Sequence, residues 1–217
     1  LPYAIGDGRE HILHVCNYSG WTSIYAPSSA ALDVFSFFKD NARVIERLPI
    51  QTHRLDDLDE VKDVDFLKID IQGGELSALV HGRMKLGSAV AVQTEMQFVN
   101  LYEGQPSYWE IDQELRSQGF IPHAFQQLKK WPIGPLIFGN NPTLPLNQIL
   151  EADVVYVRDF VRSDGVSDEQ LKHLAVVAHH CYKSFDLAGR CVAILERRGA
   201  LGFGSLQRYI SILQNNR

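Results

Sequence analysis

Two carboxylates and two glycines stand close together in the segment from residue 64 to residue 76. Asp70 follows a largely apolar run, Gly73 and Gly74 come shortly after it, and Glu75 follows directly. Glycine lets a backbone pass close to a ligand, and a carboxylate at the start of a helix is favoured by the helix dipole. The segment therefore predicts a strand with Asp70 at its carboxyl end, a ligand site, and then a helix. A simpler interpretation is that Asp70 caps the turn and Glu75 caps the helix.

A further carboxylate, Glu95, lies in the next expected strand, residues 89–98. Apolar residues alternate there with Gln93, Glu95 and Gln97, so the strand has one polar face. Ligands in open α/β sheets bind beyond the carboxyl ends of strands, so Asp70 and Glu95 are expected to face one site. His53 is an additional candidate base. Glu95 has the alternative interpretation of a polar residue on a half-exposed strand.

Strand and helix patterns alternate along the first part of the chain. Strands are expected within residues 1–25 and at 44–55, 64–71, 89–98, 121–128 and 153–158, and helices at 28–40, 75–80 and 106–119. The strand at 64–71 is apolar on both faces, as is typical of a central parallel strand. The alternation predicts an α/β fold with a mostly parallel sheet. Residues 129–148 form a long loop rich in Pro, Gly and Asn, and loops of this length often act as lids.

The chain becomes helical after residue 163, where we place a boundary between an α/β part, 1–163, and a helical tail, 164–217. Ser167 and Gln170 have the spacing of a capping box. The first two tail helices resemble one hairpin of a tetratricopeptide-type repeat, and a third helix follows. One such unit cannot form a solenoid. The tail is therefore expected to pack on the sheet, or to bind a protein partner or further helices.

Composition excludes several classes of protein. The 217 residues carry a formal net charge of −5, which disfavours nucleic-acid binding, and no apolar run is long enough to span a bilayer. Neither nucleic acid nor membrane is expected as a partner. Three widely spaced cysteines are typical of a reducing compartment, so we expect a cytoplasmic protein. No metal site is expected, because His179, His180 and Cys181 are consecutive on a helix and point in different directions.

The segment at residues 65–75, which reads DFLKIDIQGGE, resembles the motif of FkbM-type methyltransferases. In that motif a strand of the form D-F-[LI]-K-[IL]-D-[VI] runs into [EQ]-G-x-E. Further segments resemble other parts of the family in the correct order over about residues 1–160. These are AIGDG at 4–8, LDD at 55–57, QTEMQF at 93–98, LYEGQP at 101–106 and VVYVRD at 154–159.

The resemblance implies a Rossmann-like class I methyltransferase sheet, present in part, with an antiparallel last strand. It implies S-adenosylmethionine as cofactor and the hydroxyl of a sugar, glycan or other small molecule as acceptor. It assigns catalysis to Asp70, Glu95 and His53, and cofactor binding to Ala4, Ile5, Asp70, Gln72, Gly73 and Glu75. A base that takes the hydroxyl proton assists such a transfer. On this basis the loss of Asp70 is expected to be more damaging than the loss of Glu95.

Two departures from the family pattern matter. Gln72 stands where the family usually has Glu. No segment matches the glycine-rich first strand–loop–helix or the acidic end of the second strand, which hold the cofactor's methionine and ribose parts. The sequence as given is therefore expected to be a fragment that binds S-adenosylmethionine poorly, whereas a version with that unit should bind it. The alternative function is a non-catalytic interaction module derived from a methyltransferase fold. A nucleotide-dependent oxidoreductase would need a fingerprint that the sequence lacks.

Overall fold

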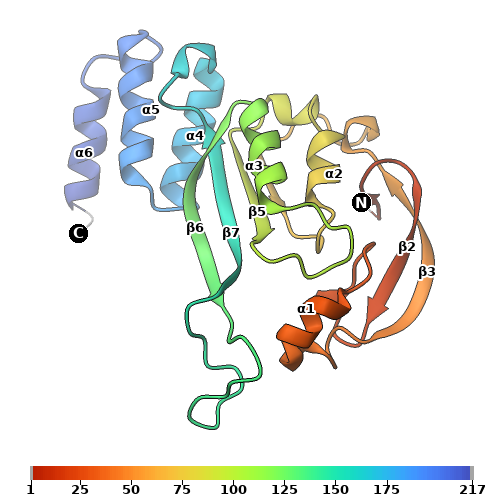
Figure 1. Cartoon of the computed structure of the whole chain (residues 1–217). Coiled ribbons are helices and arrows are strands. Elements are labelled where there is room, and N and C mark those ends of the chain that lie inside the picture. The colour runs from red at the N-terminus through yellow and green to blue at the C-terminus, as the bar shows by residue number, and fades with distance from the viewer. Residues whose placement is uncertain (1, 216–217) are drawn as a thin grey trace.

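Within residues 2–215, which the computed structural model describes, the strands form two sheets (Figure 1). The first has the order β1-β3-β2 and the second the order β4-β5-β7-β6. The strands are β1 (Ala4–Ile5), β2 (Glu10–Cys16), β3 (Val44–His53), β4 (Phe66–Ile69), β5 (Ala91–Gln97), β6 (Phe120–Lys130) and β7 (Ile149–Arg158). The helices are α1 (Ser29–Val34), α2 (Glu75–Val80), α3 (Tyr108–Ser117), α4 (Asp168–His180), α5 (Phe185–Arg197) and α6 (Ser205–Asn215). Short 3₁₀ turns include η2 (Ser36–Phe38).

The α/β architecture is confirmed, but the prediction of a mostly parallel sheet is wrong. Strand β4 pairs parallel with β5, and β1 pairs parallel with β3. The pairs β2–β3, β5–β7 and β6–β7 are antiparallel. The sheets are therefore mixed, because β7 runs opposite to both of its neighbours and β2 runs opposite to β3. The expected antiparallel last strand is confirmed in β7.

Strand β4 also differs from the expected central strand. Among the described residues it pairs only with β5, so it lies at the edge of the four-stranded sheet. The apolar run suggested burial on both faces, but Lys68 is exposed and its ammonium lies 3.7 Å from the Asp153 carboxylate. Strands β1 and β3, which precede β4 in the chain, pair with each other instead of extending its sheet.

One face of the four-stranded sheet is covered by α2 and α3. Side chains such as Val92, Met96 and Tyr156 point to this side and pack with Leu79 and Leu115 from the two helices. Tyr3 and Ile5 also pack against this cluster, which joins the small sheet to the large one. The helices are placed by local signals: Ser107 and Glu110 form a capping box at the start of α3.

The opposite face is covered in part by the helical tail. Ala91, Val155 and Val157 from the sheet share a core with Leu174 of α4 and Ile194 of α5. Figure 1 shows α4, α5 and α6 side by side, with α4 nearest to β6 and β7. The expected packing of the tail on the sheet is confirmed, and so is the capping box of Ser167 and Gln170. The boundary near residue 163 and the tetratricopeptide-like character stay predictions.

A third apolar cluster lies beside the polar end of the sheet. Trp21 and Phe38 pack with Tyr102 and Leu150, and the half-buried Trp131 joins them from the loop after β6. This cluster holds α1, η2 and the loop between β6 and β7 near the carboxyl ends of β4 and β5. Among residues 2–215, no helix has both the length and the apolar character that would cross a bilayer.

The tail packing predicts unequal effects for two substitutions on α4. Leu174 is 1% exposed and Val176 is 58% exposed. Leu174→Asn buries an amide among apolar groups, so it should lower the free energy of unfolding by about 3–5 kcal/mol, whereas Val176→Asn should change it by less than about 0.5 kcal/mol. Urea unfolding monitored by circular dichroism measures both. If the two variants unfold at the same urea concentration, α4 does not share the core of the sheet.

Candidate functional site

The pairing of β4 with β5 brings Asp70 and Glu95 together. Ile69, the last residue of β4, lies opposite Thr94 in this parallel pair. The next residue of each chain segment, Asp70 after β4 and Glu95 within β5, therefore lies at the carboxyl end of β4. Glu95 is 6% exposed, whereas Asp70 is exposed. The sequence prediction that the two carboxylates face one place agrees with this geometry, although their chemical roles stay predictions.

The turn after β4 is strained where it meets this site. Gln72 has φ 55° and Gly73 has φ 99°, both in the left-handed region, which a side chain disfavours. A Cβ on Gly73 would also lie 3.3 Å from the Tyr25 ring. The Ser23 hydroxyl donates to the Gln72 carbonyl at 2.6 Å. A glutamine in this conformation is held by its surroundings, as is common at functional sites.

The Gln72 side chain connects the two carboxylates. Its amide nitrogen donates to Asp70 Oδ1 at 2.8 Å and to Glu95 Oε2 at 3.0 Å. Its amide oxygen accepts from the Tyr102 hydroxyl at 3.0 Å. An amide can donate to two carboxylates, whereas a glutamate here would add a third negative charge. The neutral side chain at position 72 therefore suits the acidic surroundings.

Two further charged groups complete the cluster. Glu151 lies on β7 opposite Gln97, and its carboxylate accepts from the Lys129 ammonium at 2.6 Å. The same ammonium lies 3.9 Å from Glu95. The cluster thus holds the carboxyl groups of Asp70, Glu95 and Glu151 around one ammonium group.

The cluster lines a cavity of about 530 Å³, a size that is typical of small-molecule sites. Aromatic rings form much of the remaining wall, and the polar groups gather at the end of the sheet. The lining residues include Tyr18, Trp21, Phe37, Phe38, Asp70, Gln72, Glu95, Lys129, Trp131 and Glu151. An apolar wall with a few convergent polar groups is the usual form of a ligand site.

Burial, together with the neighbouring charges of Glu151 and Asp70, raises the pKa of Glu95 to about 8, while the ammonium of Lys129 opposes this shift. A carboxyl group with a pKa close to neutrality can exchange protons with a ligand under physiological conditions. Strongly perturbed groups in a cavity are candidates for catalysis. Among the carboxylates that line this cavity, Glu95 is the best placed for proton transfer.

Glu75 is buried beside the turn after β4 and lies outside the cavity. It is 3% exposed, and its Oε1 accepts from the Ile71 backbone N–H at 2.8 Å. Burial raises its pKa to about 6, although the hydrogen bond from Ile71 opposes this. Glu75 does not line the cavity of Asp70 and Glu95. Its hydrogen bond fixes the turn that presents Gln72, whereas the predicted roles of Glu75 in capping the helix and in binding the cofactor stay predictions.

The remaining predicted residues lie in the small sheet. Ala4 and Ile5 pair with Thr52 and His53 across β1 and β3. The His53 ring packs on Tyr3 at a centroid distance of 4.9 Å. None of Ala4, Ile5 and His53 lines the cavity of Asp70 and Glu95. The structure therefore does not bring these three residues to the cluster, because their strands belong to a separate sheet.

Sequence analysis identified Asp70, Gln72 and Glu95 but missed the other residues that line the cavity, among them Lys129, Trp131 and Glu151. Lys129 and Trp131 stand in a segment that the sequence predicts to be a loop, and Glu151 is the third residue of β7, which is otherwise largely apolar. A lone carboxylate in such a strand was the available signal for Glu151. The positions of Lys129 and Trp131 depend on the strand pairing of β6 with β7, which no local pattern gives.

A comparison with models of known protein families shows which family this chain belongs to. The model of the methyltransferase FkbM domain matches residues 1–122, which is more than half of the 217 residues. The chain belongs to the FkbM methyltransferase family. No curated protein and no solved structure matches it. The matched region contains Asp70, Gln72 and Glu95, whereas Lys129, Trp131 and Glu151 lie beyond it.

Methyltransferases of the FkbM family generally use S-adenosylmethionine, so the cavity must be tested for its fit to this cofactor. The sulfonium of S-adenosylmethionine is a cation, and three carboxylates face the cavity against one ammonium group. The donor set therefore fits the charged end of the cofactor. Within residues 2–215, β4 is the edge strand of its sheet, so a cofactor bound here would be contacted by these residues from one side.

The raised pKa of Glu95 predicts how stability depends on pH. The folded chain holds this proton up to about pH 8, whereas the ordinary value is 4.5. Between these values the folded state binds more protons than the unfolded state, so the free energy of unfolding falls as pH rises. Glu95→Gln removes this loss and should be more stable than the parent protein at pH 8.5 by on the order of 1–3 kcal/mol. At pH 4.5 the two should be closely similar.

Thermal unfolding at both pH values measures the effect. The exposed Glu103 provides a matched control, since Glu103→Gln should shift both midpoints by the same small amount. A difference between Glu95→Gln and the parent that does not grow with pH would show that Glu95 has an ordinary pKa.

Proposed function

We propose that this chain is an S-adenosylmethionine-dependent O-methyltransferase that acts on a hydroxyl of a sugar or other small molecule. The observation that carries the proposal is the meeting of Asp70 and Glu95 in one cavity, where Gln72 joins them. Membership of the FkbM family supports the reaction class. The geometry supports the choice of residues.

S-adenosylmethionine would supply the methyl group from its positively charged sulfonium. Asp70 is the exposed member of the cluster and lies at the carboxyl end of an edge strand. We assign it to holding this cation, with Gln72 fixing the direction of its carboxylate. A carboxylate close to a cation is stabilised most when neighbouring groups exclude water.

Glu95 is assigned to take the proton from the acceptor hydroxyl. It is buried, its pKa is raised by that burial, and Lys129 lies 3.9 Å away to stabilise the carboxylate form. A bound cation would also lower the pKa of Glu95, which makes the group a base when the site is filled. Aromatic walls from Trp21, Phe38 and Trp131 suit the apolar faces of a sugar ring or another flat ligand.

The cytoplasmic site of action forms part of the proposal. Cys16 and Cys191 are buried free thiols, and Cys181 is an exposed free thiol. Free thiols are typical of proteins in reducing compartments.

A second candidate function is a module that binds a protein partner through its tail. Phe203, which lies between α5 and α6, is 97% exposed beside a hollow that Glu196 and Leu206 help to form. A large aromatic ring exposed to this extent is typical of an interaction surface. Binding of S-adenosylmethionine separates the two functions, since only the methyltransferase requires it.

The assignments predict different effects of two conservative substitutions. Glu95→Gln should lower kcat by about 100- to 10,000-fold, because general-base contributions have this size. Asp70→Asn should mainly weaken S-adenosylmethionine binding and lower kcat less. Methyl transfer from labelled S-adenosylmethionine, measured with the natural full-length protein, gives kcat, and calorimetry gives the cofactor Kd.

Glu103→Gln serves again as the control and should leave both constants unchanged. The sequence pattern alone predicts the opposite order, with Asp70 more important than Glu95. If Asp70→Asn lowers kcat more than Glu95→Gln while the Kd is unchanged, the two roles must be exchanged. Normal turnover in both variants would remove the carboxylates from the mechanism.

A further inference from the structure

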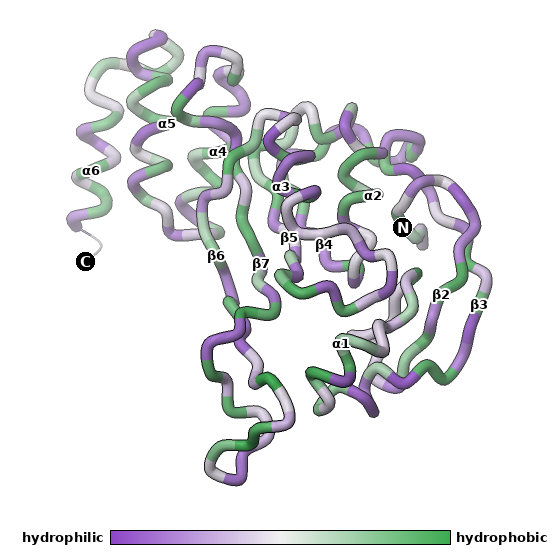
Figure 2. The backbone as a smooth tube through the Cα atoms, viewed as in Figure 1, coloured by the Kyte–Doolittle hydropathy of each residue, from purple (hydrophilic) through white to green (hydrophobic). Residues whose placement is uncertain are grey.

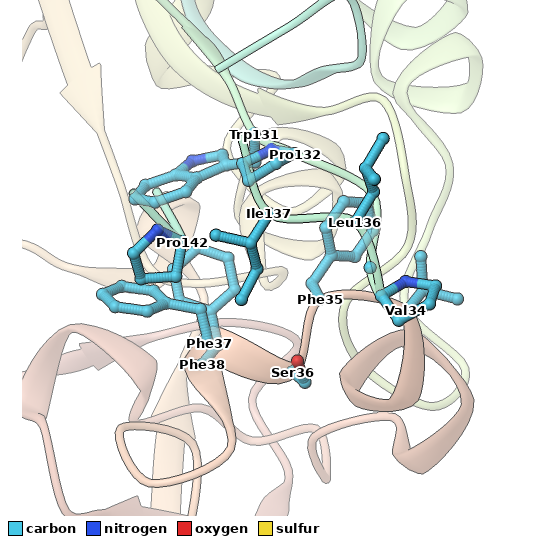
Figure 3. A pocket seen from close by; sticks show the side chains of 12 residues that line it. Val34, Phe35, Ser36, Phe37, Phe38, Trp131, Pro132, Leu136, Ile137 and Pro142 are labelled. Carbon is cyan, nitrogen blue, oxygen red and sulfur yellow. The ribbon is translucent and has the colours of Figure 1, made fainter. Parts of the chain in front are cut away.

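A second, apolar cavity adjoins the acidic one. It has a volume of about 250 Å³ and lies between residues 34–38, at the end of α1 and in η2, and residues 131–142 of the loop after β6. Figure 3 shows Phe35, Leu136, Ile137 and Trp131 around this space. No charged side chain lines it, and Ser36 supplies its only hydroxyl. Such a lining suits an uncharged apolar group.

Specific contacts hold the two walls together. The Gly134 backbone N–H donates to the Val34 carbonyl at 3.0 Å, and a Cβ at position 134 would lie 2.9 Å from that oxygen. The Phe37 and Trp131 rings stack at a centroid distance of 5.8 Å, and the Phe38 ring meets Trp131 edge-on at 4.6 Å. The groove is therefore formed by packed residues on both sides.

The groove remains uncovered in the structure. Leu136 is 59% exposed and Ile137 is 58% exposed. Figure 2 shows hydrophobic stretches along the same loop, which extends away from the sheet. Exposed apolar residues that gather in one groove are typical of a binding site.

The groove and the acidic cavity share a wall. Phe37, Phe38 and Trp131 line both spaces. A molecule that places a hydroxyl at Glu95 can therefore continue past these rings into the groove. The wall that residues 131–142 form lies beyond residues 1–122, which the family model matches. This half of the groove is therefore not part of the matched family pattern.

We propose that the methyl acceptor is amphipathic, with its hydroxyl-bearing polar part in the acidic cavity and an unbranched alkyl chain in the groove. This inference rests on the proposed function, because the polar part is located by Glu95. The small volume of the groove suits one narrow chain. The occupant is a part of the substrate, which follows from the shared aromatic wall.

The test uses methyl, butyl and octyl β-glucosides as probes, each below its micelle concentration. Calorimetry on the natural full-length protein measures their affinities without any transfer reaction. Burial of one methylene contributes about fourfold in affinity, so octyl glucoside should bind at least 50-fold more tightly than butyl glucoside if four more methylenes enter the groove.

Substitutions in the groove should remove this dependence on chain length. Leu136→Asn and Ile137→Asn place amides on the wall, so the ratio of octyl to butyl affinity should fall by at least tenfold. Leu144→Asn is the matched control, since Leu144 lies in the same loop, is 40% exposed and does not line the groove. It should keep the ratio of the parent protein.

The possible outcomes distinguish a failure of the groove proposal from a failure of the proposed function. If the ratio collapses in the groove variants but no glucoside or other hydroxyl compound is methylated, the groove binds alkyl chains and the methyltransferase proposal fails. If methyl transfer occurs with equal kcat/KM for all chain lengths, the groove proposal is overturned and the function stands. Binding to phosphatidylcholine vesicles that Leu144→Asn and Ile137→Asn weaken equally would also overturn the groove, since it would show a loop that docks on a membrane.

Discussion

The parallel pairing of β4 with β5 is the constraint on which the site depends. The register places Ile69 opposite Thr94, so Asp70, which follows β4, comes close to Glu95, which lies within β5. The amide of Gln72 then donates to both carboxylates. A one-residue slip of the register would turn Glu95 towards the helices α2 and α3, because alternate residues of a strand face opposite sides.

The polar face of β5 can exist because the tail covers only part of the sheet. Ala91 meets the helical tail, whereas Glu95 lies farther along the same face and lines the aromatic cavity. A buried carboxylate in these surroundings has a raised pKa, which Lys129 limits. The same burial that makes Glu95 suited to proton transfer thus costs the folded state stability at high pH.

Local signals in the sequence predicted several helices and strands and the first residues of the acidic cluster, Asp70 and Glu95. The capping box of Ser167 and Gln170 depends on residues three positions apart, so it forms as predicted. The motif around Asp70 and Gly73 gave the turn and the family, which the family model confirms. Polar alternation in residues 89–98 identified Glu95 before any contact was known. In each case the physical cause lies within a few residues of the pattern.

Tertiary structure decided what depends on distant pairing. The edge position of β4 and the mixed sheets follow from which strands meet, and a single strand's apolar run cannot encode its partners. Lys129 and Glu151 come close to Glu95 only because β7 pairs with β5 on one side and with β6 on the other. The groove exists because Trp131 packs on Phe38, almost a hundred positions earlier in the chain. The sequence shows which side chains could do chemistry. The long-range contacts that bring these side chains into one site depend on packing energies spread over the whole core.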